Sequence, residues 1–215
     1  MKISFRKCNG LTLIEVLVIF TIVGLLTGLL LPMLQKPVKR GQRITCVNNL
    51  KQVGLSFRLW AGDNGENYPM QVSTNLGGTI EFAQSPVAFR HFQVLSNELG
   101  TPKVTFCPQD TNRTNSSNFY DFSNLNLSYF VAIDANETNA NMVLSGDRHI
   151  TNGSAPKNGM LFLMTNQNVR WSKDLHTNKN NIGFADGGVQ QVSSKALKTE
   201  ILVKTGFATN RIALP

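Results

Sequence analysis

A long run of apolar residues follows the short basic segment at the start of the chain. Between residues 11 and 34 the only formally charged side chain is that of Glu15. With a helical rise of about 1.5 Å per residue, residues 16–34 alone would span roughly 28 Å, close to the roughly 30 Å of a bilayer core. A secretory signal peptide is the alternative, but its apolar core is normally only about 7–15 residues long. The pattern therefore predicts a transmembrane helix over residues 11–34.

The helical pattern resumes after Pro32 and Pro37, each of which removes a backbone donor and favours a kink. Apolar residues then recur at spacings of four, three, four and three, which places them on one stripe of a helix. The stripe consists of Cys46, Leu50, Val53, Phe57 and Trp60. We interpret it as a face that packs on the core, in preference to a groove for a partner. Turn-forming residues follow, so residues 35–62 are expected to be a soluble continuation of the N-terminal helix.

Residues 63–215 combine short apolar runs with many Asn, Gly, Ser and Pro residues, which predicts a domain rich in turns. Two helices are expected, one from Ser85 to Gly100 and one over Ser194–Lys204 that Gly206 closes. The expected strands are Leu127–Ile133, Met142–Leu144, Met160–Met164, Asn181–Ala185 and Val189–Val192, the last two joined by a hairpin at Asp186-Gly187-Gly188. Helices and strands together place the chain in the α+β class.

Charge is distributed unevenly along the chain, whose formal net charge is +8. Lys2, Arg6 and Lys7 precede the apolar run, and residues 11–62 carry six cations against Glu15. Residues 63–215 have twelve cations and twelve anions. Because a nucleic-acid partner requires clustered cations on a folded face, the neutral domain makes that partner unlikely.

Residues 7–18, KCNGLTLIEVLV, resemble the processing motif of type IV pilins and type II secretion pseudopilins. The resemblance implies a pilin-like fold, in which the long helix packs on a small antiparallel β-sheet domain. It also implies that residues 1–10 are a cytoplasmic leader, which a prepilin peptidase removes by cutting between Gly10 and Leu11. The new amine of Leu11 is then methylated, although members of this family commonly have Phe at that position. Glu15 matches the acidic residue of the family.

Glu15 is an unusual residue for a membrane helix, where a carboxylate at the centre costs roughly 2.5–3.5 kcal/mol. It can lie at the headgroup level, and it can also neutralise a positive group of a neighbouring subunit, such as the amine freed by cleavage; the two interpretations are compatible. Gly24 and Gly28 form a G-x-x-x-G pair that would let helices approach closely. The sequence therefore marks Glu15, Gly24 and Gly28 as residues for assembly.

The topology follows from the resemblance, because cations flank both ends of the apolar run and the positive-inside bias is nearly balanced. We expect a single-pass protein of the bacterial inner membrane with a cytoplasmic leader and an extracytoplasmic domain. Cys8 would be lost with the leader. Cys46 and Cys107 would remain and either form a disulfide, worth about 4 kcal/mol in the chain-entropy model, or stay as two buried thiols.

A second resemblance lies at residues 176–187, HTNKNNIGFADG, which are similar to the H-x9-DG domain of bacterial prepilin-type proteins. Further similarities to that set are residues 43–55, Phe106-Cys107-Pro108, Gly146-Asp147-Arg148 and Trp171. We expect His176, Asp186 and Gly187 to be structural, with His176 and Asp186 hydrogen-bonded so that they fix the hairpin.

No cofactor is expected from the sequence, and the chain is not expected to be an enzyme. His91, His149 and His176 are too dispersed to indicate a metal site, and C-x-x-C pairs are lacking. A Ca²⁺ ion held by Asp134, Asp147 and Asp186 is the alternative, although the sequence has no D-x-D-x-D-G loop. A nucleophile motif of the G-x-S-x-G kind is also missing.

The function expected from these features is structural: a pilin-like or pseudopilin-like subunit of a type II secretion or type IV pilus-like fibre. Its expected partners are the prepilin peptidase, other pilin or pseudopilin subunits and inner-membrane lipid. The alternative is a membrane- or fibre-anchored module that displays a glycan- or protein-binding domain. Exposure of Trp171, Tyr120 and Tyr129 would favour a glycan ligand.

Overall fold

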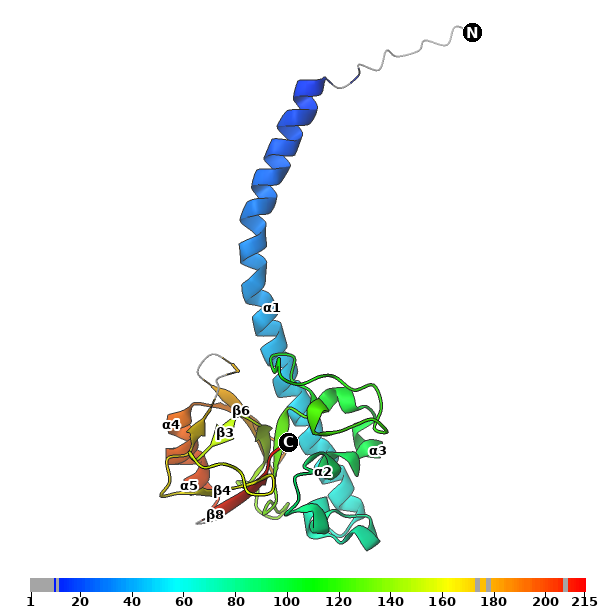
Figure 1. The fold of residues 1–215 in the computed structure, drawn as a ribbon, viewed down its shortest axis with the longest axis vertical. Helices are drawn as coiled ribbons and strands as arrows, with labels where there is room; N and C mark the ends of the chain where they lie inside the picture. The colour runs from blue at the N-terminus through cyan, green and yellow to red at the C-terminus, as the bar shows by residue number, and fades with distance from the viewer. Residues whose placement is uncertain (1–9, 11, 173–174, 177–178, 207–208) are drawn as a thin grey trace, which may run out of the picture. The chain divides into compact units, whose positions relative to one another are not determined.

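The computed structural model describes residues 10, 12–172, 175–176, 179–206 and 209–215, and the side chains of 30–37 are not among them. The chain divides into two units, Met1–Gly41 and Gln42–Pro215. Residues 1–9 of the predicted leader, with Cys8, and the predicted methylation site Leu11 lie outside the described residues. Figure 1 places the labelled strands and the helices α2 to α5 in the second unit.

Helix α1 (Leu13–Asp63) contributes to both units. It continues through Pro32 and Pro37, so the prolines that interrupt the sequence pattern do not end the helix. Within the first unit, the apolar side chains from Leu13 to Leu29 are exposed, including 84% of Leu13 and 72% of Phe20. Among the described residues, no helix has the length and hydropathy of a membrane-crossing segment.

The second half of α1 supplies the core of the domain. The predicted stripe is buried throughout, with exposures between 0% and 7%, which confirms it as a core face: Cys46, Leu50, Val53, Phe57 and Trp60. The Phe57 ring meets the rings of Tyr68 and Phe92 edge-on, with centroids 5.9 and 5.8 Å apart. Edge-on aromatic pairs add about 0.5–1.5 kcal/mol beyond the area they bury. The helix is therefore an internal element of this unit.

An antiparallel sheet of six strands packs around this part of α1, in the order β4-β8-β1-β2-β6-β7. Strands β3 and β5 form a separate two-stranded sheet. The long N-terminal helix and the antiparallel sheet confirm the α+β class. The strands are β1 (Tyr129–Ala132), β2 (Val143–Asp147), β3 (Ile150–Thr151), β4 (Met160–Met164), β5 (Arg170–Trp171), β6 (Asn180–Phe184), β7 (Val189–Val192) and β8 (Thr209–Ala213).

Strand β8 is the element that the sequence pattern misses, although it lies inside the sheet between β4 and β1. Its five residues, TNRIA, are too short and too polar to show a clear alternation. The strand forms because β4 pairs with all five of its residues and β1 pairs with Ile212 and Ala213. Tertiary pairing therefore decides this element, and local propensity does not.

The short helices differ from the two that the sequence predicts. The helix expected from Ser85 to Gly100 consists of two pieces, α2 (Phe89–Gln93) and α3 (Ser96–Leu99), because the backbone leaves the helical region at Leu95. The helix expected over Ser194–Lys204 comprises α4 (Ser194–Ala196), a π-helical turn (Leu197–Ile201) and α5 (Leu202–Lys204). Single 3₁₀ turns occupy Pro69–Gln71, Thr74–Leu76, Ile80–Phe82, Pro102–Thr105 and Asn124–Asn126.

The sheet requires glycine at two places, one in a turn and one where two strands approach closely. The predicted hairpin joins β6 to β7, and its turn residue Gly187 has a φ of +84°, a conformation that L side chains rarely adopt. Gly146 of β2 lies so close to neighbouring atoms that an added Cβ would come within 2.8 Å of the Asn181 carbonyl oxygen and of the Phe130 ring. Any larger residue at 146 would therefore push β2 away from β6.

A buried histidine in α2 makes the stability of the domain depend on pH. The Nδ1 atom of His91 lies 2.8 Å from the Thr79 hydroxyl, and burial lowers the pKa of His91 to about 4. Between about pH 6.5 and pH 4 the unfolded chain therefore holds one more proton than the folded chain. As the pH falls through this window, His91 lowers the free energy of unfolding.

We expect the free energy of unfolding to fall by roughly 2–3 kcal/mol more in the wild-type chain than in a His91→Gln variant between pH 7.5 and pH 4.5. Denaturant titrations of both chains in detergent at the two pH values measure this difference. An equal loss in the two chains would show that His91 is not neutral in the folded state.

Candidate functional site

The first turn of α1 is held by a reciprocal pair of side-chain and backbone contacts. Thr12 lies directly before the helix, and its backbone N–H and hydroxyl donate to Glu15 Oε2 at 2.7 and 2.8 Å. The Glu15 N–H in turn donates to the Thr12 hydroxyl at 3.4 Å. This arrangement is a capping box, and it also places a carboxylate at the positive end of the helix dipole. Glu15 is therefore hydrogen-bonded within its own chain.

The other residues predicted for processing and assembly lie on open surface of the first unit. Gly10 is exposed. A Cβ added to Gly24 or Gly28 would meet no atom within 4 Å among the described residues. Packing within the described chain therefore does not require glycine at these two positions.

A second group of predicted residues meets in the interior of the domain, around a disulfide between Cys46 and Cys107. Both cysteines are fully buried. The segment that carries Cys107 is also fixed to α1 by Asn49, whose side-chain amide donates to the Phe106 carbonyl at 2.8 Å. The Tyr129 hydroxyl of β1 donates to the Cys46 carbonyl at 3.2 Å. Helix, loop and sheet thus converge at Cys46.

His176 lies beside the disulfide and is buried. Its Nε2 atom is 3.8 Å from Cys107 Sγ and 3.4 Å from Asp147 Oδ2, while its Nδ1 atom contacts Gln109 Oε1 at 2.5 Å. Asp147 is fully buried and also accepts the Asn181 N–H at 2.6 Å. Cys107 and Asp147 face the same ring nitrogen of His176. In a catalytic nucleophile–histidine–acid relay, the nucleophile and the acid face opposite nitrogens, so this cluster has a different geometry.

An ion pair lies close to this cluster in the chain. Arg148 Nε and Nη2 donate to the fully buried Asp110 carboxylate at 2.7 and 2.9 Å, and His149 Nε2 lies 4.0 Å from it. Burial alone would raise the pKa of Asp110, but the hydrogen bonds and charge of Arg148, aided by His149 and the Asn112 N–H, hold that pKa below its ordinary value. Asp110 is therefore ionised at neutral pH.

The predicted bond between His176 and Asp186 is wrong within the described residues. Asp186 is exposed in the hairpin turn, where its carboxylate accepts the Gly188 N–H at 2.7 Å. Arg58 donates to its carbonyl at 3.1 Å. His176 instead contacts residues of two other segments, Gln109 and Asp147. The hairpin is fixed by its own turn and by α1.

The alternative Ca²⁺ site is also not assembled. Asp134 is paired with Arg211, Asp147 faces His176, and Asp186 lies in the β6–β7 turn. Within the described part of the chain, the one group of His, Cys, Asp or Glu residues close enough to share a metal ion is Cys46, Cys107 and His176. The three carboxylates therefore have different neighbours and do not converge on one site.

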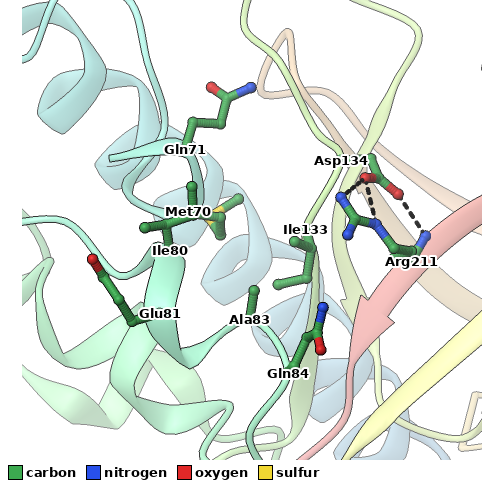
Figure 2. Close-up of a pocket in the computed structure, with 9 residues that line it drawn as sticks. All are labelled: Met70, Gln71, Ile80, Glu81, Ala83, Gln84, Ile133, Asp134 and Arg211. Carbon is green, nitrogen blue, oxygen red and sulfur yellow. Dashed lines mark hydrogen bonds and ion pairs between the residues drawn. The ribbon is translucent and has the colours of Figure 1, made fainter. Parts of the chain in front are cut away.

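The domain also has an open pocket of about 650 Å³, shown in Figure 2. Its lining is Met70, Gln71, Ile80, Glu81, Ala83, Gln84, Ile133, Asp134 and Arg211. Arg211 and Asp134 face each other on one side of it, with Nε and Oδ1 2.8 Å apart, and this hydrogen bond raises the pKa of Arg211. Glu81 accepts from the Ser73 hydroxyl and the Thr74 N–H. The charged groups of the pocket are thus already paired.

The aromatic residues considered for a glycan ligand are mostly interior. Trp171 is 5% exposed and donates to the Val192 carbonyl at 2.8 Å. Tyr129 is fully buried, and burial raises its pKa well above the ordinary value, so it is a neutral donor. Only Tyr120 of the three is exposed. This burial removes the sequence argument for a glycan-stacking surface.

The comparisons with known proteins point to the N-terminal segment. Residues 5–31 match the family model of the prokaryotic N-terminal methylation motif. This match supports a type IV pilin-like N-terminal segment. No curated protein matches the chain, and no solved structure does so either. The motif indicates a substrate of prepilin peptidase that assembles with other pilins and has a membrane-anchored N-terminus in bacteria.

Two features of these sites are not predicted from the sequence: the capping box of Thr12 and Glu15, and the cluster around His176. The capping box has a local signal, a threonine followed three residues later by a glutamate, which is visible in Thr12-Leu13-Ile14-Glu15. The cluster around His176 has none, because its residues come from three distant segments of the chain. Cys107, Asp147 and His176 each lie in a motif fragment, whereas Gln109 does not, and only the fold brings the four residues together.

We expect an Arg148→Met variant to lower the free energy of unfolding by about 3–5 kcal/mol, because it leaves the Asp110 charge buried without its partner. Arg58→Met is the matched control: it removes the Arg58–Glu137 pair and the Arg58 hydrogen bond to the Asp186 carbonyl, both at the surface, and should cost only about 1–2 kcal/mol. Denaturant titration at pH 7 measures both.

An Asp110→Asn/Arg148→Met double variant should recover part of the loss, because no charge remains buried. Equal stability of the Arg148→Met and Arg58→Met chains would contradict the role given to the buried pair.

Proposed function

We propose that this chain is a structural pilin-like or pseudopilin-like subunit, which a prepilin peptidase processes and which assembles into a type II secretion or type IV pilus-like fibre. The match of residues 5–31 to the methylation motif carries this proposal. In it, residues 1–10 are the leader, residues 11–34 are held in the bacterial inner membrane, and the domain from residue 63 onward is extracytoplasmic. The chain itself catalyses no reaction.

The exposed apolar residues of α1 support an assembly role. From Leu13 to Leu29 these side chains have exposures of 39% or more, and burying one large aliphatic side chain is worth about 1.5–3 kcal/mol. Lipid would cover this surface before assembly, and the same helices of neighbouring subunits would cover it in the fibre. Gly24 and Gly28 would allow those helices to approach closely.

Glu15 would set the register of the subunits. Cleavage between Gly10 and Leu11 removes three cationic side chains and creates an amine, which would pair with the Glu15 carboxylate of a neighbouring subunit inside the apolar bundle. The capping contacts with Thr12 hold the carboxylate at the start of the helix, close in the sequence to the cleavage position. Pairing would offset the cost of burying both charges.

We also propose that residues 176–187 are the segment of an H-x9-DG domain and that its residues are structural. The buried position of His176 beside the disulfide and the turn formed by Asp186 and Gly187 support this role. In the fibre, such a domain would form the outer surface around the helical bundle.

Mass spectrometry of the chain isolated from membranes tests the processing step. We expect a chain that begins at Leu11 and carries one added methyl group on its amine, and a Gly10→Val variant that keeps the leader without detectable processing. Recovery of the native chain with Met1 attached, from cells that process another prepilin, would overturn the proposal.

Fibre assembly by Glu15 variants tests the charge pairing and separates it from helix capping. Glu15→Ala removes both the charge and the cap, whereas Glu15→Gln keeps an oxygen that can accept from Thr12. We expect both variants to be inserted and cleaved but to yield no fibres, as measured by shearing and immunoblotting. Fibres from Glu15→Gln would contradict the ion pair, and fibres from Glu15→Ala would contradict any role of Glu15 in assembly.

A further inference from the structure

The disulfide and His176 bring three potential metal ligands together in the interior of the domain. Cys46 Sγ, Cys107 Sγ and a ring nitrogen of His176 all lie within 4.8 Å of one another. The three side chains are at most 1% exposed. They come from α1, from the loop before Asp110 and from the segment before β6, so the complete domain is required to assemble them.

We propose that reduction of the Cys46–Cys107 bond converts this cluster into a Zn²⁺ site, with Cys46, Cys107 and His176 as ligands and the fourth position on the side of Asp147. The domain would then have two alternative cross-links at one place. One is the disulfide, and the other is the metal ion.

The distances suit a tetrahedral zinc ion. With Zn–S of about 2.3 Å and Zn–N of about 2.0–2.1 Å, neighbouring ligand atoms lie roughly 3.3–3.8 Å apart. Cys107 Sγ and His176 Nε2 are already 3.8 Å apart, and the three ligand atoms all lie within 4.8 Å of one another. Once the bond between the sulfurs is broken, they need only separate to admit the ion.

The surroundings of His176 orient the correct nitrogen. Gln109 Oε1 contacts Nδ1, so it can accept the Nδ1 proton and leave the Nε2 lone pair facing Cys107. Partners of this kind fix the tautomer of zinc-bound histidines, and their loss typically weakens metal binding by about 10–100-fold. With the proton on Nδ1, the Nε2 lone pair is free to bind the ion.

Asp147 borders the site and has an oxygen that could accept from a metal-bound water in the fourth position. Its Oδ2 atom accepts the Asn181 N–H, whereas its buried Oδ1 atom has no hydrogen-bond partner in the described part of the chain. A buried acceptor without a partner is unfavourable, and contact with a cation or with a metal-bound water would relieve that cost.

The chemistry balances with a dithiol reductant. Two electrons and two protons pass from the dithiol to the disulfide, which becomes two thiols while the dithiol becomes a disulfide. Zn²⁺ then binds both thiolates and releases the same two protons. The two thiolate charges neutralise the ion, so metal and thiolates together add no net charge to the buried site. Because the ligands are buried, the ion would enter as the domain folds.

The experiment uses the full chain in detergent, in a Cys8→Ser background so that only Cys46 and Cys107 carry thiols. The chain is unfolded, reduced with a dithiol, separated from it without oxygen and refolded with increasing amounts of Co²⁺ as a spectroscopic substitute for Zn²⁺. We expect one ion per chain, with the d–d bands of tetrahedral cobalt and thiolate-to-cobalt charge transfer. The oxidised chain should show neither, and Zn²⁺ should displace Co²⁺ and raise the Tm of the reduced chain.

Variants locate the site and guard against simple misfolding. Cys107→Ser and His176→Gln should abolish the cobalt spectrum, and Gln109→Leu, which keeps all three ligands, should weaken binding by about 10–100-fold. His91→Gln is the matched control, because it removes a buried histidine outside the cluster and should bind normally. The proposal is overturned if the reduced chain binds no Co²⁺, if reduction leaves it unable to fold with Zn²⁺, or if His176→Gln keeps the spectrum.

Discussion

The domain depends on one packing contact, that between the buried stripe of α1 and the antiparallel sheet. The five residues of the stripe, between Cys46 and Trp60, are almost entirely removed from solvent. Arg58 of the same helix and Tyr68, which follows it, donate hydrogen bonds to the carbonyls just after β6. Apolar burial of this kind is the largest favourable term in folding. The other elements are arranged around the helix, including the short strands that have little propensity of their own.

The same helix has opposite surroundings in the two units. Its second half has its apolar stripe inside the domain, whereas the apolar side chains of its first half are exposed on the described chain. A soluble monomer rarely leaves so large a contiguous apolar surface uncovered, because such surfaces associate with lipid or with other chains. This contrast agrees with the methylation motif, which covers residues 5–31 and thus the part of the helix that lacks partners.

Some of this structure could be predicted from the sequence, and the reason the rest could not is physical. The helix stripe and strands β4 and β7 have clear periodicity, so their positions were predicted correctly. Strand β8 and the cluster around His176 depend on contacts between distant segments, such as the 69 positions that separate Cys107 from His176. Trp171 and Tyr129 show the same limit, because neither the two-residue strand β5 nor the apolar run that holds Tyr129 indicates from the sequence alone which side chains are buried.

The position of β8 has a consequence for biogenesis. Residues 209–213 occupy an interior place in the sheet, between strands that begin at residues 160 and 129. Until they have been synthesised and have folded, β4 and β1 each present an unpaired edge, which is a template for wrong strand pairing. The sheet can thus close only after residue 213 has been synthesised, and a chaperone that shields strand edges would have its substrate during that interval.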